Sequence, residues 1–153
     1  MVLTKEERNR SVVFLLNGMN TSLKSIIPIQ SEIAKPTLVG SSLSLHFGVL
    51  IGFTGDVKGK LILAGDPSVF GAIGEAMFGM AVEGEMLASF SGELGNMLAG
   101  NLSTTIIQNG IKTDITAPTI MQGSTALSGY EKALQLSVVF EKIGKLDIYL
   151  LLD

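Results

Sequence analysis

Apolar side chains recur at helical spacing in three parts of the chain. Residues 5–25 form the first part, and we expect that helix to end before Pro28, since proline lacks the N–H that a helix interior needs. The second part begins at Asp66-Pro67, where a good N-cap residue is followed by a proline suited to the first helical position. This helix is expected to stop near Gly79.

The third part is a long helix predicted over residues 85–109, with Gly110 as the residue just past its end. Between the helices, apolar and β-branched residues gather in extended segments, and turn residues separate them. We expect strands at 30–40, 43–53, 57–64, 112–121, 127–141 and 144–152, with turns at 54–56 and 141–144. Helices and strands in this order predict a single α+β domain over residues 1–153, an antiparallel sheet with packed helices.

Short sequence matches between the two halves indicate an internal repeat. They are separated by 76, 82, 83 and 85 residues and occur in the same order in both halves. The pairs are 17–20 (NGMN) with 93–96 (ELGN), 36–37 with 118–119 (PT), 40–41 with 123–124 (GS), and 59–61 with 144–146 (GKL). The slow drift of the separation is typical of small insertions in loops, so we expect a duplicated unit related by a pseudo-two-fold axis.

The composition disfavours some classes of function. Charged residues make up 16% of the chain, below the usual ~25%, and apolar residues make up 46%. This lean charge favours a buried partner surface such as a subunit interface. The net charge is −3, which disfavours binding to nucleic acid. No apolar run reaches the ~18 residues of a membrane span, and no signal peptide is evident, so we expect a cytoplasmic protein without membrane insertion.

Several kinds of catalytic site are disfavoured. The chain has no Cys and one His, His46, which lies in an apolar strand pattern and is expected to be structural. His and carboxylates show no metal-ligand spacing. Gly71 and Gly74 lie inside a helix pattern without the nucleotide-binding fingerprint, so they are expected to serve packing.

The helix over 85–109 has two unlike faces. The face predicted to enter the core holds Met86, Phe90, Leu94, Met97, Leu98, Thr105 and Ile106. The opposite stripe holds Ser89, Gly92, Glu93, Asn96, Gly100 and Ser103, in which every member but Glu93 and Asn96 is small. Three interior glycines, at 92, 95 and 100, cost the helix on the order of 2–3 kcal/mol. Either close packing inside the fold or close approach of a partner protein would explain them, and the spacing alone leaves both open.

Residues 89–101 (SFSGELGNMLAGN) resemble the motif of the CheC/CheX/FliY phosphatases. Ser89, Glu93 and Asn96 match that motif in register. Pro118 follows Asn96 after 21 residues, one fewer than in the family pattern, within residues 114–119 (DITAPT), which also resemble a family stretch. The first repeat holds Asn17 where the acid would be, so the chain is most similar to the CheX-type members, which keep one site.

The resemblance implies a CheC/CheX-like fold and a phosphatase acting on the phospho-aspartate of a CheY-like receiver domain, without a covalent intermediate. Asn96 would position the attacking water and Glu93 would pair with the receiver's lysine. Gly92 and Gly100 would let the receiver come close, and Ser89 would either belong to the same partner-binding surface or only support the helix. No cofactor is expected on this chain; Mg²⁺ would belong to the receiver. The family also implies a homodimer.

Two other interpretations stay open at this point. One is a non-catalytic module of the same fold that binds a receiver or acts in a flagellar switch. The other is an unrelated small α+β dimer that uses the glycine stripe as its interface.

Overall fold

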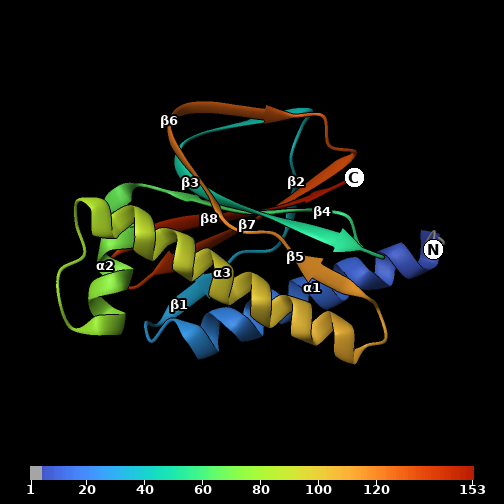
Figure 1. The fold of residues 1–153 in the computed structure, drawn as a ribbon, viewed down its shortest axis with the longest axis horizontal. Coiled ribbons are helices and arrows are strands. Elements are labelled where there is room, and N and C mark those ends of the chain that lie inside the picture. Colours follow the sequence, from blue (N-terminus) through green and yellow to red (C-terminus); the bar gives the residue numbers. More distant parts are fainter. Residues whose placement is uncertain (1–4) are drawn as a thin grey trace.

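Three helices lie on one side of an antiparallel sheet in the computed structural model, which describes residues 5–153 (Figure 1). The first four residues of the predicted 1–153 domain lie outside the described residues. The elements are α1 Lys5–Ile26, β1 Ser31–Ile33, β2 Thr37–Leu38, β3 Ser42–Gly55, β4 Gly59–Gly65, α2 Pro67–Phe78, α3 Glu85–Gln108, β5 Thr113–Ile115, β6 Thr119–Ser128, β7 Lys132–Phe140 and β8 Gly144–Leu152. The predicted order of helices and strands is confirmed.

The helix ends follow local chemistry. The Asp66 carboxylate accepts a hydrogen bond from the Ser68 backbone N–H at 2.9 Å, which caps α2 as expected. Gly79 ends α2 in the left-handed region with φ 73°, and Gly110 follows α3 with φ 84°. Both glycine stops predicted from the sequence are therefore confirmed.

The strands differ from prediction in both halves. The segment expected over 30–40 is two short strands, β1 and β2, and β3 runs to Gly55, so the turn expected at 54–56 lies at 56–58. The segment expected over 112–121 is β5 followed by the start of β6, and the break contains Pro118, which has no N–H for the ladder. β6 then continues to Ser128 through residues 122–126, for which no strand was predicted. The strand expected over 127–141 starts only at Lys132, because a turn with Gly129 at φ 84° precedes it.

The order of the strands in the sheet is symmetric. If each strand of the first half is exchanged for its counterpart in the second half, the order read from the opposite edge is the same. It is β1-β7-β8-β4-β3-β5, with β2 also paired to β7 and β6 also paired to β3. β1 and β2 from the first half thus pair with β7 of the second half, for example at Ser31↔Phe140. β5 and β6 from the second half pair with β3 of the first half, for example at Phe53↔Ile115. This arrangement confirms the pseudo-two-fold repeat.

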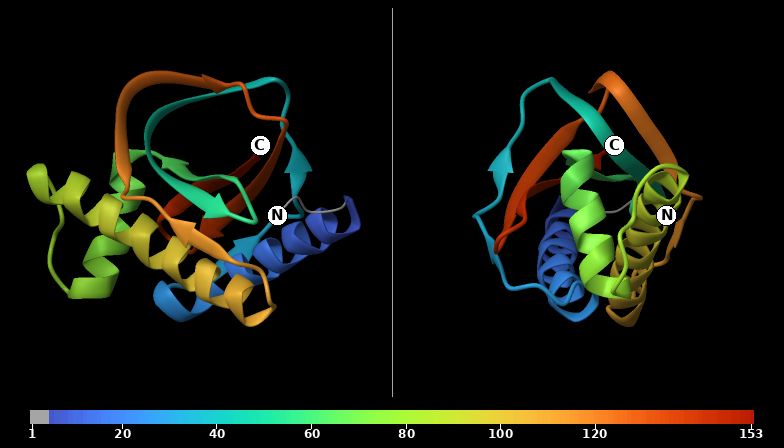
Figure 2. Two further views of the ribbon diagram at one scale, coloured as in Figure 1. Left: turned by 45° about the vertical axis from the view of Figure 1, so that its right-hand side comes forward. Right: turned by 90° about the vertical axis from the view of Figure 1, so that its left-hand side faces the viewer.

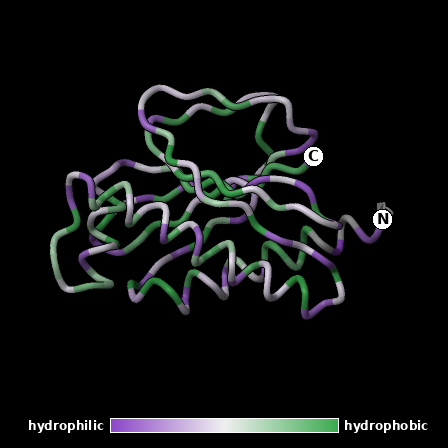
Figure 3. Tube along the Cα trace, viewed as in Figure 1, coloured by the Kyte–Doolittle hydropathy of each residue, from purple (hydrophilic) through white to green (hydrophobic). Residues whose placement is uncertain are grey.

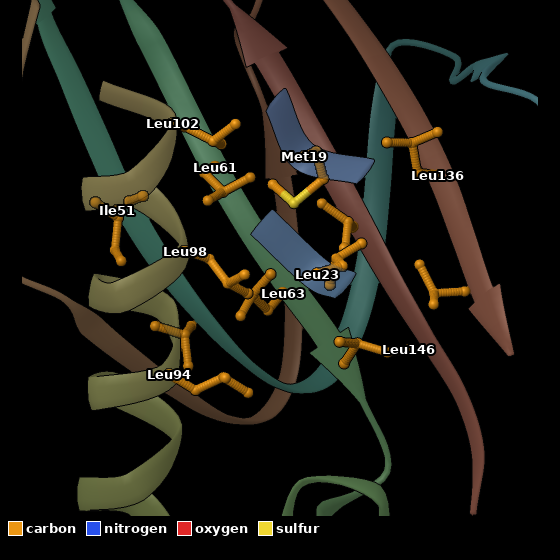
Figure 4. Packing of buried hydrophobic residues seen from close by; sticks show 14 of the residues in the cluster. Met19, Leu23, Ile51, Leu61, Leu63, Leu94, Leu98, Leu102, Leu136 and Leu146 are labelled. Atoms are coloured by element: carbon orange, nitrogen blue, oxygen red, sulfur yellow. The ribbon is translucent and has the colours of Figure 1, made fainter. Parts of the chain in front are cut away.

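The main core lies between the sheet and the helices. Figure 4 shows Leu94, Leu98 and Leu102 of α3 directed toward Leu61 and Leu63 of β4, with Met19 and Leu23 of α1 beside them. A smaller apolar cluster lies on the other face, where β3 and β6 arch away from the helices (Figure 2). It contains Leu43, Leu45, Ile62, Tyr149 and Leu151.

Hydropathy follows this layering (Figure 3). The central strands are mostly hydrophobic, whereas the helices alternate between hydrophobic and hydrophilic positions, as expected for helices that cover one face of a sheet. Within residues 5–153, no helix combines the length and the hydropathy needed to cross a bilayer.

Candidate active site

The exposed stripe of α3 carries the residues predicted to be functional. Leu94, Leu98 and Leu102 are completely buried, which fixes the rotation of the helix about its axis. That rotation leaves Ser89, Glu93 and Asn96 exposed on the opposite side. Residues three or four apart are neighbours on a helix surface, so these three side chains form one line. The structure thus brings the predicted acid and amide together in solvent.

The glycines of α3 serve two different purposes. An added Cβ at Gly95 would lie 2.9 Å from Val49 Cγ1 of β3, and one at Gly92 would lie 3.3 Å from Ile120 Cδ1 of β6. Both glycines therefore let the helix pack closely on the sheet. A Cβ at Gly100 would meet nothing within 4 Å. The assignment of Gly92 to an open partner surface is wrong, because that residue is buried against β6, while Gly100 remains open.

Two further positions on α3 differ from the periodic prediction. Met86, expected in the core, is 53% exposed, and Ser103, expected on the outer stripe, is only 8% exposed. The first turns of α3 pack on α2, where Phe78 and Phe90 meet edge to face, rather than on the sheet. Helical periodicity alone could not indicate which neighbour covers each turn.

The predicted motif at 114–119 forms the corner between β5 and β6. The Thr116 hydroxyl accepts a hydrogen bond from the Gly52 backbone N–H at 2.8 Å, and the Thr116 N–H donates to the Gly52 carbonyl at 2.9 Å. Pro118 then lies 3.6 Å from where a Gly92 Cβ would be. The corner thus joins β3 to the segment that packs against Gly92, the residue before Glu93 on α3.

α1 presents the corresponding stripe of the first repeat. Asn17 and Asn20 are exposed there, as Glu93 and Asn96 are on α3. The two helices are in contact, since a Cβ at Gly18 would lie 3.0 Å from Leu102 Cδ2, and the Ser22 hydroxyl donates to Asn101 Oδ1 at 3.1 Å. α1 therefore has the position of a second site with an amide in place of the acid.

Other candidate residues lie apart from this stripe. His46 is exposed at an irregularity of the β3–β6 pairing, beside Asp66, Asp147 and Tyr149, on the sheet face opposite α3. Val82 would lie 2.7 Å from a Cβ at Gly74, which agrees with the packing role expected for the α2 glycines. In the part of the chain that the structure describes, no group of three or more His, Asp or Glu could hold a metal ion.

The geometry defines what the stripe can do. An exposed carboxylate can accept hydrogen bonds from a cationic donor, and a carboxamide one turn away can both donate and accept. With its glycine at 100, the helix offers a partner a narrow surface on which these two groups project. The fold is that of the CheC/CheX-type α+β domains, as comparison with solved structures shows.

CheX from Desulfovibrio desulfuricans superposes with a TM-score of 0.79 over 94% of this chain and 99% of that one, at 15% identity. The CheX chain of a CheX–CheY–BeF₃–Mg²⁺ complex from Borrelia burgdorferi superposes with a TM-score of 0.77 over 92% and 96% of the two chains, at 22% identity.

Sequence comparisons identify the family. The sequence-family model described as chemotaxis phosphatase CheX matches residues 47–141 of this chain. The CheY-P phosphatase CheX of Thermotoga maritima is 31% identical over 118 residues, which cover 74% of this chain and 76% of that protein. The chain belongs to the CheX family of chemotaxis phosphatases, and it is accordingly a phosphatase. Family membership excludes the interpretation as an unrelated α+β dimer.

Proposed function

We propose that this protein hydrolyses the phospho-aspartate of a CheY-like receiver domain, with Asn96 positioning the attacking water and Glu93 holding the receiver in register. The observation that carries the proposal is that Glu93 and Asn96 stand exposed and adjacent on α3, backed by the buried leucines of the same helix. The name of the Thermotoga maritima relative and the CheX–CheY complex from Borrelia burgdorferi support the choice of substrate.

The chemistry suits a site without a nucleophilic side chain. An acyl phosphate already has a good leaving group, so hydrolysis needs mainly an oriented water and compensation of charge. The Asn96 carboxamide can hydrogen-bond a water in line with the phosphorus–oxygen bond, as a Gln does in GTPases. Water then attacks phosphorus directly, the aspartate carboxylate leaves, and inorganic phosphate forms without a covalent intermediate on this chain.

Glu93 has a separate task. Its carboxylate projects one turn before Asn96 and is exposed, so it can form a charge-assisted hydrogen bond with a lysine of the receiver. We place the Mg²⁺ ion on the receiver and none on this chain. Ser89, the third exposed member of the line, would contact the receiver's edge, and open Gly100 would let the receiver approach the helix backbone.

A matched pair of variants tests the catalytic role. Asn96→Ala is expected to slow phosphate loss from a phosphorylated receiver on the order of 100-fold, because the water is no longer oriented. Asn20→Ala, at the corresponding exposed position of α1, should leave the rate unchanged. Melting temperatures of both variants check the fold. Full activity of Asn96→Ala would refute the role of Asn96.

Glu93→Gln separates docking from chemistry. This substitution keeps the size of the side chain and removes its charge, so KM for the receiver should rise more than kcat falls. A loss confined to kcat would contradict the docking role.

The dephosphorylation assay with the wild-type protein addresses the non-catalytic alternative, a module that binds receivers or acts in a flagellar switch. Binding of a receiver whose phosphate lifetime stays unchanged by the wild-type protein would favour that alternative.

We also propose that the protein is a cytoplasmic homodimer. The family and the low content of charged residues support this proposal. Light scattering at micromolar concentration should give twice the chain mass, and a monomeric mass would contradict it.

A further inference from the structure

A groove opens beside Glu93, between the end of α2, the loop over 79–84 and the first turns of α3. Its volume is about 540 Å³. Ser89 and Glu93 are among its lining residues, so the groove is continuous with the proposed docking stripe. Of the remaining lining residues, Glu85 is acidic and four are apolar: Phe78, Val82, Met86 and Phe90.

The apolar side chains of this groove are unusually open to solvent. Phe78 is 58% exposed and Met86 is 53% exposed, while Val82 and Phe90 beneath them are 7% exposed. Phe78 meets Phe90 edge to face, with ring centroids 5.7 Å apart. Single exposed apolar residues are common on proteins, but adjoining ones around a hollow mark a contact surface.

The groove has a fixed shape. The side chain of Val82 lies so close to α2 that a Cβ on Gly74 would come within 2.7 Å of it, which holds the loop against the helix. Gly79 and Gly84, both with positive φ, turn the chain at either end of the loop. A partner would meet a preformed surface and would not have to order the loop on binding.

The elements that form the groove carry charge of one sign. Residues 61–111, which include α2, the loop and α3, contain no Lys, Arg or His. Their acids are Asp66, Glu75, Glu83, Glu85 and Glu93. Glu85 and Glu93 line the groove itself, and Glu83 is exposed in the adjoining loop. Charge complementarity therefore favours a partner that carries basic residues around an apolar one.

The groove lies close enough to the proposed catalytic amide for one receiver domain to contact both. Met86 and Asn96 are ten residues apart, which corresponds to about 15 Å along the helix axis. A domain of ~120 residues has a radius of gyration of roughly 14 Å. A single receiver domain seated over Asn96 is thus wide enough to cover the groove as well.

We propose that this groove binds an apolar side chain, flanked by Lys or Arg, of the same receiver domain whose phospho-aspartate meets Asn96. The inference rests on the proposed function and adds to it a determinant of which receivers are accepted. Phe78 and Met86 provide the apolar contact, and Glu83 and Glu85 attract the basic residues around it.

Met86→Ser tests the apolar contact, with Val139→Ser as its matched control. Val139 is 51% exposed and belongs to β7, on the sheet face opposite the helices. Steady-state dephosphorylation of a phosphorylated receiver should show KM raised about tenfold in Met86→Ser, equivalent to about 1.4 kcal/mol, with kcat unchanged. Val139→Ser should match the wild type. Phe78→Ser is a second variant with the same expected effect, and melting temperatures check the fold of all three.

An unchanged KM in both groove variants would overturn the inference while leaving the phosphatase proposal intact. A wild-type protein that does not accelerate dephosphorylation would instead refute the proposed function. A second copy of this chain is the competing occupant. If Met86→Ser lowers the mass in light scattering and leaves KM unchanged, the groove is a contact between copies and the inference fails.

The charge argument has its own test. KM of the wild type should rise with ionic strength, because exposed charges are screened over about 10 Å at 0.1 M salt. Glu83→Gln combined with Glu85→Gln should raise KM at low salt and flatten this dependence. Equal salt dependence of the double variant and the wild type would overturn the assignment of basic residues to the partner.

Discussion

Replacing Gly100 by alanine is expected to stabilise the protein and at the same time to weaken its reaction with the receiver. Gly100 lies one turn beyond Asn96 on the exposed stripe, and an added Cβ there meets nothing within 4 Å. The matched substitution is Gly95→Ala, on the buried side of the same helix, where the new Cβ would lie 2.9 Å from Val49 Cγ1 and 3.1 Å from Ile51 Cδ1.

The two variants share one favourable contribution and differ in packing. Alanine is better than glycine inside a helix by about 1 kcal/mol, so Gly100→Ala should be more stable by about that amount. In a chain of this size the melting temperature should rise by about 2–4 °C. At Gly95 the same gain is offset by about 1–3 kcal/mol of overpacking against β3. We therefore expect Gly95→Ala to be less stable than the wild type by about 1 kcal/mol.

Activity should change in the opposite sense. A methyl group at position 100 keeps the receiver from approaching the helix backbone, so KM should rise about fivefold, which corresponds to about 1 kcal/mol. Gly95→Ala changes nothing on the exposed stripe and should keep the wild-type KM at a temperature where it is folded. Thermal unfolding followed by circular dichroism and dephosphorylation kinetics on the same preparations measure both effects.

A decrease in stability for Gly100→Ala would refute the conclusion that this face of α3 is open. A gain in stability with an unchanged KM would refute the assignment of Gly100 to the receiver interface. Increased stability of Gly95→Ala would show that β3 can move away from α3, contrary to the close packing inferred here.

Three further outcomes follow from the fold. Leu98→Ala should lower the free energy of unfolding by about 3 kcal/mol in urea titrations, because Leu98 is completely buried and its loss leaves a cavity. An effect below about 1 kcal/mol would contradict the packing of α3. Hydrogen bonds from the Ser68 backbone N–H and then its hydroxyl lower the pKa of Asp66, so its cap is present above about pH 4 and is lost as the pH falls further. Asp66→Ala should therefore melt below the wild type near pH 7, with a difference that shrinks at about pH 3; a constant difference would contradict this. Burial, and then the charge of Asp147, raise the pKa of Tyr149. The fold favours its neutral form, so stability should fall as the pH rises past about 10, and Tyr149→Phe should flatten that loss in alkaline melting curves.

Local sequence signals located the helices and their ends well. Asp66, Gly79 and Gly110 act through their own backbone and side chain, so their effects could be predicted without knowing the neighbours. The exposed pair Glu93 and Asn96 could be predicted for a similar reason, since the leucines of the same helix set its orientation.

Features that depend on distant contacts were harder to predict. Gly92 and Gly100 look alike in the sequence, and the positions of Ile120 and Pro118 distinguish the buried one from the open one. Met86 fits the apolar period of α3 but has no sheet beneath it. β6 continues past Gly123 and Ser124, whose composition gives no strand signal, because β3 pairs with the flanking residues Gln122 and Thr125.

The exchange of edge strands between the two halves has a consequence for synthesis of the protein. β1 must wait for β7, since Ser31 pairs with Phe140, and the first half cannot complete its sheet as it leaves the ribosome. β3 likewise lacks its outer neighbours until residues 113–128 have been made. We expect the sheet to stay incomplete until β7 emerges from the ribosome. The nascent chain should therefore need protection from aggregation for longer than a protein built from two independently folding halves.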